Sequence, residues 1–177
     1  MGYTGGSRVD PTYHQLGDHT EAYQLDFDPA RISYAQLLAR FWEAHRPQRP
    51  AYKRQYRAAL WYADAAQERL ARESAEQVAR TLGKPVLTDL EPLGRFYPAE
   101  PYHQKYALRR HADLLEELED YDDEALREST VAARLNGYVS GQGSAELLAR
   151  EWEGYGLPES ARGKLETLLR GFGRLSV

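Results

Sequence analysis

The side chains with the clearest potential for chemistry lie between Phe96 and Tyr106. This stretch combines four aromatic rings with the carboxylate of Glu100 and the imidazole of His103. Binding pockets are typically lined by aromatic rings, with a few polar groups that orient the ligand. Aromatic rings also supply much of the packing area in small cores. The stretch could therefore be the wall of a site or the anchor of a C-terminal helix, and its composition leaves both interpretations open.

The absence of cysteine limits the chemistry that this chain can perform. None of the 177 residues is a cysteine, which excludes disulfides, thiolate metal sites and a cysteine nucleophile within this sequence. A metal site made of nitrogen and oxygen ligands would have to combine His14, His19, Glu21 and His103. These residues lack the close, regular spacing of a ligand set, so we expect neither a metal nor another cofactor.

Charge and hydrophobicity restrict the class of partner. The net charge is -4 and no block rich in Lys or Arg occurs, so we expect no nucleic-acid partner. No apolar run approaches the roughly 20 residues that a membrane span needs, so we expect no membrane partner. The first residues do not resemble a signal peptide. We therefore expect a cytoplasmic globular protein.

Turn residues and periodicity predict the elements that position these groups. The glycines of residues 2–6 are typical of a tight turn at a strand end. Alternation of residue types predicts a half-buried strand over residues 21–27. Ser33 and Asp64 are suited to capping the starts of two helices, and Gly83 to ending the second. Strands are also predicted over residues 58–63 and 86–90, and helices over residues 123–139, 145–154 and 159–170.

Several short motifs follow one another in a fixed order over roughly the first 110 residues. They are Gly2-Tyr3-Thr4-Gly5-Gly6, Pro11-Thr12-Tyr13, Gly17-Asp18-His19-Thr20-Glu21-Ala22, Phe27-Asp28-Pro29, Ile32-Ser33-Tyr34, Phe41-Trp42-Glu43-Ala44-His45, Gln55-Tyr56-Arg57 and the Phe96–Gln104 stretch. In this order and spacing the chain resembles the peptide methionine sulfoxide reductase A family, which repairs the S epimer of methionine sulfoxide.

The resemblance implies a fold and a division of the chain. The fold class would be α+β, a ferredoxin-like two-layer sandwich lacking its first strand and helix, with a helical C-terminal extension. Residues 1–122 would form the reductase-like domain, N-terminally incomplete, and residues 123–177 the helical extension. Within that extension, Arg134-Leu135-Asn136-Gly137-Tyr138 resembles the corresponding part of one family branch.

The resemblance also implies a reaction. In the family, a cysteine thiolate attacks the sulfur of free or peptide-bound methionine sulfoxide, and the sulfoxide oxygen takes up a proton. The resulting cysteine sulfenic acid is reduced by a second thiol, and finally by thioredoxin. Glu21 matches the carboxyl group that shares its proton with this oxygen, and Tyr13 and Tyr56 match the phenols that donate hydrogen bonds to it. Supporting polar groups would be Glu100, His103, Asp18 and His19.

Without this register, the same residues would have ordinary structural interpretations. A glutamate at the start of a strand is usually solvated or caps a neighbouring amide, and Tyr13 could simply cover the edge of the core. The catalytic assignment of Glu21, Tyr13 and Tyr56 therefore depends on the whole series of motifs.

The sequence departs from the family at the nucleophile. The family carries it in a Gly-Cys-Phe-Trp-Gly segment upstream of the Gly2–Gly6 match, and no residues here correspond to that segment. We expect the sequence to be a shortened form of the enzyme, and a chain of these residues alone to be inactive as a reductase. The alternatives are a non-catalytic relative that binds methionine sulfoxide or a protein, and a decayed gene product.

Overall fold

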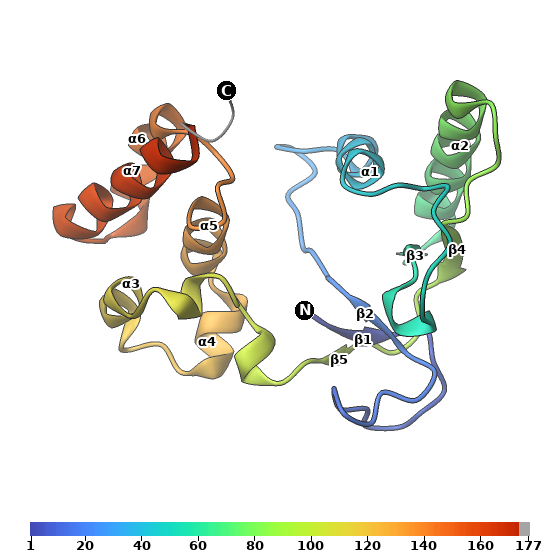
Figure 1. Ribbon diagram of the computed structural model, residues 1–177, viewed down its shortest axis with the longest axis horizontal. Coiled ribbons are helices and arrows are strands. Elements are labelled where there is room, and N and C mark those ends of the chain that lie inside the picture. Colours follow the sequence, from blue (N-terminus) through green and yellow to red (C-terminus); the bar gives the residue numbers. More distant parts are fainter. Residues whose placement is uncertain (174–177) are drawn as a thin grey trace. The chain divides into compact units, whose positions relative to one another are not determined.

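The computed structural model describes residues 1–173, and the chain clusters into two compact units, Met1–Glu100 and a second that starts at Pro101 (Figure 1). Residues 174–177, the end of the predicted helical extension, lie outside the described residues. The first unit combines strands with two long helices, and the second is helical. The predicted α+β class is therefore confirmed.

A small antiparallel sheet carries the first part of the chain. Its strands are β1 (Gly2–Thr4), β2 (Thr20–Ala22) and β5 (Tyr97–Pro98), in the order β2-β1-β5. Tyr3 lies opposite Glu21 on one side and Tyr97 on the other, and it is 0% exposed. The turn after β1 needs glycine, because Gly5 has a φ of 75° and a Cβ there would lie 2.9 Å from the rings and guanidinium of Trp61 and Arg57.

The prediction of a strand over residues 21–27 is wrong beyond Ala22. Residues 23–28 have no regular backbone pairing, and Tyr23 and Leu25 are exposed. The reason is the length of β1, which offers β2 a partner of only three residues. Alternation in the sequence cannot extend a strand for which no partner backbone exists.

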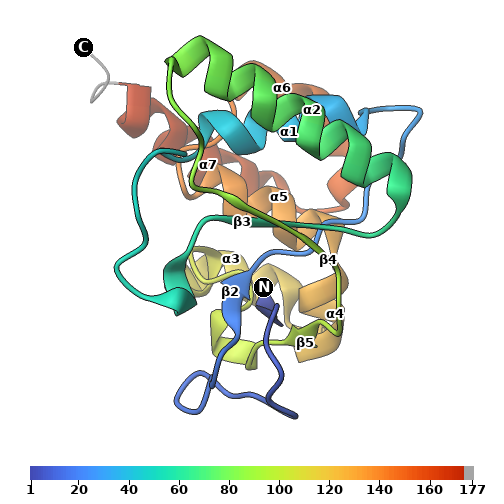
Figure 2. The same ribbon diagram turned by 90° about the vertical axis from the view of Figure 1, so that its right-hand side faces the viewer.

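A two-layer arrangement forms the rest of the first unit. Strand β3 (Ala59–Tyr62) pairs in parallel with β4 (Asp89–Pro92), and α1 (Tyr34–Glu43) and α2 (Ala65–Leu82) lie on one side of this pair (Figures 1 and 2). Trp42 of α1 packs with Ala71 and Ala75 of α2 in the core. The small alanine side chains leave space for the indole between the helices.

The predicted ends of these helices are confirmed. Ser33 forms a capping box with Gln36, and Asp64 accepts a hydrogen bond of 2.8 Å from the Gln67 amide. Gly83 ends α2 with a φ of 66°.

Of the two predicted strands, β3 lies within residues 58–63 as expected, whereas β4 starts three residues later than predicted. The Leu87 amide donates to the Pro47 carbonyl, which holds residues 86–87 in a loop before the pairing with β3 begins.

The second unit is built from helices around one core. They are α3 (Ala112–Leu115), α4 (Asp123–Glu128), α5 (Thr130–Tyr138), α6 (Ala145–Glu151) and α7 (Glu159–Gly173), with short 3-10 turns between them. The helices predicted over residues 145–154 and 159–170 are confirmed, although α6 ends at Glu151 and continues as a 3-10 turn.

The single helix predicted over residues 123–139 is wrong. Ser129 has an extended backbone and its hydroxyl accepts from the Ala132 amide at 3.0 Å, so it ends α4 and caps α5. The predicted domain boundary between residues 122 and 123 stays a prediction. The two compact units themselves divide at Pro101, and Leu108, Leu114 and Leu118 belong to the core of the second.

Glu151 joins three side chains inside the second unit. It accepts hydrogen bonds from the hydroxyls of Tyr138 at 3.0 Å and Tyr155 at 2.5 Å, and it pairs with Arg134 at 2.7 Å. Burial opposes ionisation of Glu151, but the two phenols and the arginine outweigh it, so its pKa lies below the usual value. The carboxylate thus fixes α5 to the end of α6.

We expect Glu151→Ala to lower the free energy of unfolding of the second unit by about 2 kcal/mol, because the buried Tyr138 hydroxyl loses its acceptor. Denaturant titration followed by fluorescence measures this in a Trp42→Phe, Trp61→Phe background, in which Trp152 is the remaining tryptophan. Glu153→Ala, an exposed neighbour in the following 3-10 turn, is the control and should have little effect. Equal losses in the two variants would show that the network contributes no stability.

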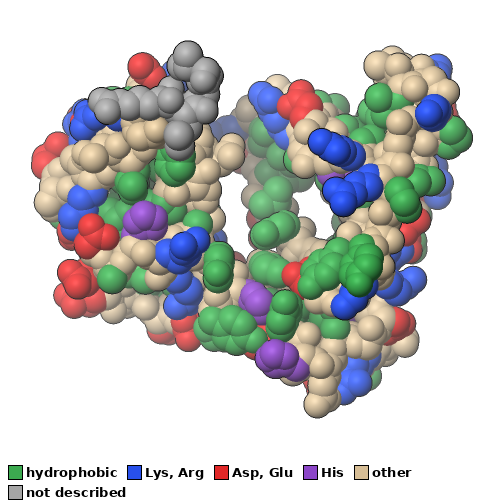
Figure 3. All heavy atoms as spheres, in the orientation of Figure 1, with side chains coloured by type: hydrophobic (Ala, Val, Ile, Leu, Met, Phe, Trp, Pro, Cys, Tyr) green, Lys and Arg blue, Asp and Glu red, His purple; other side chains and the backbone are tan. Residues whose placement is uncertain are grey.

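The surface of each unit mixes both signs of charge. On the face drawn in Figure 3, Lys and Arg side chains are interspersed with Asp, Glu and apolar side chains. Among the helices of residues 1–173, none is long and apolar enough to cross a membrane.

Candidate active site

The loop between β1 and β2 is closed by Asp18 and His19. The Asp18 carboxylate accepts from the Ser7 amide at 2.8 and 2.9 Å. His19 is buried, its Nδ1 accepts from the Gly6 amide at 3.2 Å, and its Nε2 lies 2.8 Å from the Arg8 carbonyl. A carbonyl can only accept, so the ring proton is on Nε2. These contacts position the residues that lead into Glu21.

The hydrogen bonds to Asp18 make the stability of this loop depend on pH. The backbone amide of Ser7, aided by its hydroxyl and the Arg8 amide, lowers the pKa of Asp18 from 3.8 to about 2. Because the pKa of Asp18 is lower in the folded state, its ionised carboxylate stabilises the protein at pH values above the pKa of the unfolded chain. This stabilisation is lost as the pH falls from about 3.8 towards 2.

We therefore expect the melting temperature of the wild-type chain to fall more steeply between pH 4 and pH 2 than that of Asp18→Asn, which has no such proton to gain. Calorimetry over this range measures the difference. The matched control is Asp26→Asn, which changes an exposed aspartate outside the loop. Parallel curves for the wild type and Asp18→Asn would contradict the assignment.

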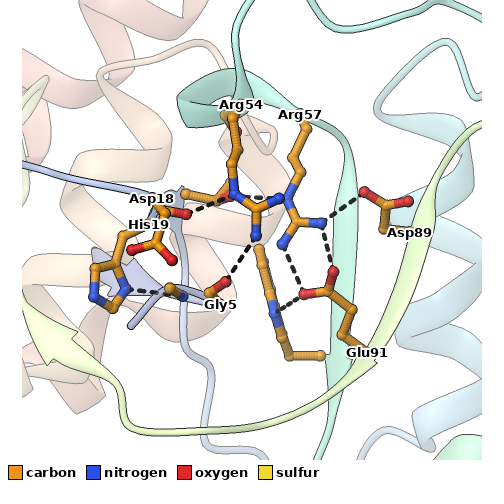
Figure 4. A network of polar contacts seen from close by, with 10 residues as sticks. Gly5, Asp18, His19, Arg54, Arg57, Asp89 and Glu91 are labelled. Carbon is orange, nitrogen blue, oxygen red and sulfur yellow. Dashed lines mark hydrogen bonds and ion pairs between the residues drawn. The ribbon is translucent and has the colours of Figure 1, made fainter. Parts of the chain in front are cut away.

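A 3-10 turn, Arg54–Tyr56, is bound along the end of this loop (Figure 4). The Arg54 guanidinium donates to the carbonyls of Asp18 at 2.7 Å and Gly5 at 3.1 Å. The Thr20 hydroxyl donates to the Arg54 carbonyl at 3.2 Å. These bonds hold the turn against β2 and so bring Tyr56 close to Glu21.

Arg57 anchors the same turn to the parallel strand pair (Figure 4). Its guanidinium pairs with Asp89 at 2.7 Å and with Glu91 through both terminal nitrogens, while its Nε donates to Thr20 at 2.9 Å. The hydrogen bond with Glu91 raises the pKa of Arg57, and the same bond lowers the pKa of Glu91. The Trp61 indole also donates to Glu91, at 3.0 Å.

Glu100 fixes the loop that carries Tyr13. The buried Tyr3 hydroxyl donates to Glu100 Oε2 at 2.6 Å, and the Tyr13 amide donates to Oε1 at 2.9 Å. Tyr13 also packs beside Tyr3 in a small core with Leu16. Both oxygens of Glu100 thus hold β1 and the loop in one position.

The three residues expected to bind the sulfoxide oxygen come together in the first unit. The pKa of the Tyr56 phenol is raised, chiefly through the phenol of Tyr13, and Glu21 lies near enough to contribute. Tyr56 is 53% exposed, so the group opens to solvent. Two phenols and a carboxyl group can together hydrogen-bond and protonate one substrate oxygen.

Gln55 is a member of this group that the sequence did not single out. Its Nε2 donates to Glu21 Oε1 at 2.6 Å. The signal was its place in the Gln55-Tyr56-Arg57 motif.

Two further expectations concern the supporting role of His103 and the residues considered as metal ligands. His103 belongs to the second unit, where its ring lies 4.3 Å from that of Tyr102, so its support of the site stays a prediction. No group of three or more possible metal ligands occurs among residues 1–173.

The known proteins to which this chain is similar are methionine sulfoxide reductases. The peptide methionine sulfoxide reductase family model matches residues 1–134, and that of the selenoprotein methionine sulfoxide reductase A helical domain matches residues 120–161. A peptide methionine sulfoxide reductase of Drosophila melanogaster is 40% identical over 164 residues, 92% of this chain and 66% of that protein. Peptide methionine sulfoxide reductase A5 of Oryza sativa subsp. japonica is 40% identical over 146 residues, 79% of this chain and 58% of that protein.

The fold is also found among solved structures. Methionine sulfoxide reductase A of Corynebacterium diphtheriae superposes with a TM-score of 0.58 at 30% identity, and the match covers 62% of each chain. The chain thus spans less than two thirds of the length of these similar proteins.

Proposed function

The chain belongs to the peptide methionine sulfoxide reductase family, and from this premise we propose that Glu21, Tyr13 and Tyr56 bind and protonate the oxygen of methionine S-sulfoxide. The observation that carries the proposal is that the turn of Tyr56 is bonded to β2, with Gln55 donating to Glu21 at 2.6 Å, while both Tyr13 and Glu21 lie near enough to the Tyr56 phenol to raise its pKa. A sulfoxide oxygen that enters between these groups accepts from both hydroxyls.

Each residue has a defined part in the proposed reaction. The phenols donate to the oxygen without ionising, which polarises the S–O bond. Glu21, in its protonated form, gives a proton to the oxygen as the S–O bond breaks. A thiolate takes up the oxygen and this proton to become a sulfenic acid, while the sulfoxide becomes a thioether. The two-electron oxidation of the thiolate balances the two-electron reduction of the sulfoxide.

The thiolate is not supplied by these 177 residues, because they contain no cysteine. We therefore propose that they form the oxygen-binding part of a reductase site and do not turn over alone. In a complete enzyme of this family, a second thiol and then thioredoxin would reduce the sulfenic acid.

A second candidate function uses the same residues without catalysis. This candidate is a protein that binds methionine sulfoxide and leaves it unchanged, which would need no cysteine. The DNA upstream of Met1 separates the candidates. An in-frame Gly-Cys-Phe-Trp-Gly segment would support the reductase, and a stop codon without such a segment would support the binder.

Titration calorimetry with three matched peptides tests the binding that both candidates require. The peptides contain methionine S-sulfoxide, methionine R-sulfoxide or unoxidised methionine. We expect the S form to bind best, and Tyr13→Phe or Tyr56→Phe to weaken its binding about tenfold each, because each loses one hydrogen bond. Equal affinity for the S-sulfoxide and unoxidised peptides would overturn the proposal.

A further inference from the structure

We infer that Gln55 is a positioning residue for Glu21, which orients its carboxyl group and assigns its proton to Oε2. The inference rests on the proposed function of Glu21 as a proton donor. It adds a role for a residue that itself need not touch the substrate.

The contact between the two side chains has a defined direction. Gln55 Nε2 lies 2.6 Å from Glu21 Oε1 and the two residues are 34 positions apart in the sequence. The amide NH2 group can only donate, so Oε1 accepts. The carbonyl oxygen of a neutral carboxyl group is a stronger acceptor than its hydroxyl oxygen, so this bond favours Oε1 as the carbonyl oxygen. The proton of the neutral carboxyl group therefore lies on Oε2, and the hydrogen bond to Oε1 restricts rotation of the group.

The backbone on both sides of Gln55 is fixed by other bonds. Arg54 donates to the Asp18 and Gly5 carbonyls, and Arg57 pairs with Asp89 and Glu91. Gln55 thus presents its amide from a turn that does not depend on the Gln55 side chain. A substitution of this side chain removes the donor and leaves Tyr56 in place.

The orientation of Glu21 is important because the phenols of Tyr13 and Tyr56 lie nearby. Tyr13 and Glu21 both lie near the Tyr56 phenol, so in the proposed reaction the carboxyl group has to deliver its proton to the same oxygen that both phenols contact. Catalytic groups need a geometry held within about 10–20°. Without Gln55, Glu21 rotates freely between orientations and only a fraction of them are productive.

The contact can be tested first without substrate. In the NMR spectrum of the free chain, the hydrogen-bonded amide proton of Gln55 should lie downfield and exchange slowly, and Glu21→Ala should abolish both properties. The side-chain carboxyl carbon signal of Glu21 should shift in Gln55→Met, which keeps the length of the side chain but has no donor. An unchanged Gln55 amide signal in Glu21→Ala would overturn the inference.

The effect on binding is then measured by titration with the methionine S-sulfoxide peptide. We expect Gln55→Met to weaken binding about tenfold with an unchanged melting temperature, and to have no further effect in the Glu21→Ala background. The matched control is Gln77→Met, an exposed residue of α2, which should bind as the wild type does.

The outcomes separate this inference from the proposed function. If Gln55→Met weakens binding by the same factor in the wild type and in the Glu21→Ala background, Gln55 does not act through Glu21. That result would overturn the inference and leave the proposed function standing. Binding that is lost in Glu21→Ala but unchanged in Gln55→Met would do the same. A wild-type chain that binds no sulfoxide would overturn the proposed function and the inference with it.

Discussion

Glu21→Ala should bind the methionine S-sulfoxide peptide about 100-fold more weakly than the wild-type chain. Glu21 lies near the Tyr56 phenol, whose pKa is raised chiefly by Tyr13, and the carboxyl group of Glu21 is itself held by Gln55 at 2.6 Å. Removing it takes away one donor to the sulfoxide oxygen, the donor that Gln55 orients. Glu21→Gln keeps a donor of similar length, so we expect it to recover part of the affinity.

Titration calorimetry at a fixed pH measures this loss. Glu73→Ala, which changes an exposed glutamate of α2, is the matched control because it removes the same group from a surface pair with Arg69. An affinity of Glu21→Ala within twofold of this control would contradict the assignment of Glu21.

Arg57→Leu should lower the free energy of unfolding of the first unit by about 3 kcal/mol. The Arg57 side chain is only 9% exposed and it bonds to carboxylates on β4 and to Thr20 on β2. The substitution leaves the paired carboxylates of Asp89 and Glu91 beside each other without a cation, and it releases β2 from the parallel strands. Tyr56, the preceding residue, should lose its fixed position as well.

Denaturant titration can be restricted to the first unit by fluorescence. Trp42 and Trp61 lie in the first unit and Trp152 in the second, so a Trp152→Phe background reports the first unit alone. Arg69→Leu is the control, since its ion pair with Glu73 is exposed and such pairs contribute about 0–1 kcal/mol. A loss no larger for Arg57→Leu than for this control would show that the network is not a structural anchor.

Local signals in the sequence predicted those parts of the fold that neighbouring residues determine. Ser33, Asp64 and Gly83 cap helices through bonds to residues a few positions away, and all three predictions are confirmed. The extent of β2 and the start of β4 could not be predicted in this way. They depend on the length of β1 and on a hydrogen bond from Leu87 to Pro47, which lies far away in the sequence.

In the candidate site, too, local sequence signals could not predict what depends on contacts between distant residues. Periodicity gives no reason for Tyr13, Glu21 and Tyr56 to meet, because a loop and a 3-10 turn carry them. Only the order of the motifs pointed to them as a group. The bonds that bring Tyr56 to Glu21 come from Arg54 and Arg57, which a sequence pattern presents as ordinary surface arginines. The sequence did not single out Gln55, because its role depends on a contact with Glu21, which lies 34 positions away.

We propose that this chain binds the sulfoxide oxygen and that its 177 residues do not supply the nucleophile. One NMR experiment tests both parts, with a methionine S-sulfoxide peptide labelled with ¹³C at its methyl group and mixed with the wild-type chain and dithiothreitol. We predict that the methyl signal shifts on binding, that it shifts less with Glu21→Ala, and that it remains a sulfoxide signal for hours. A signal that does not respond to the chain, or one that converts to that of the thioether, would contradict the account.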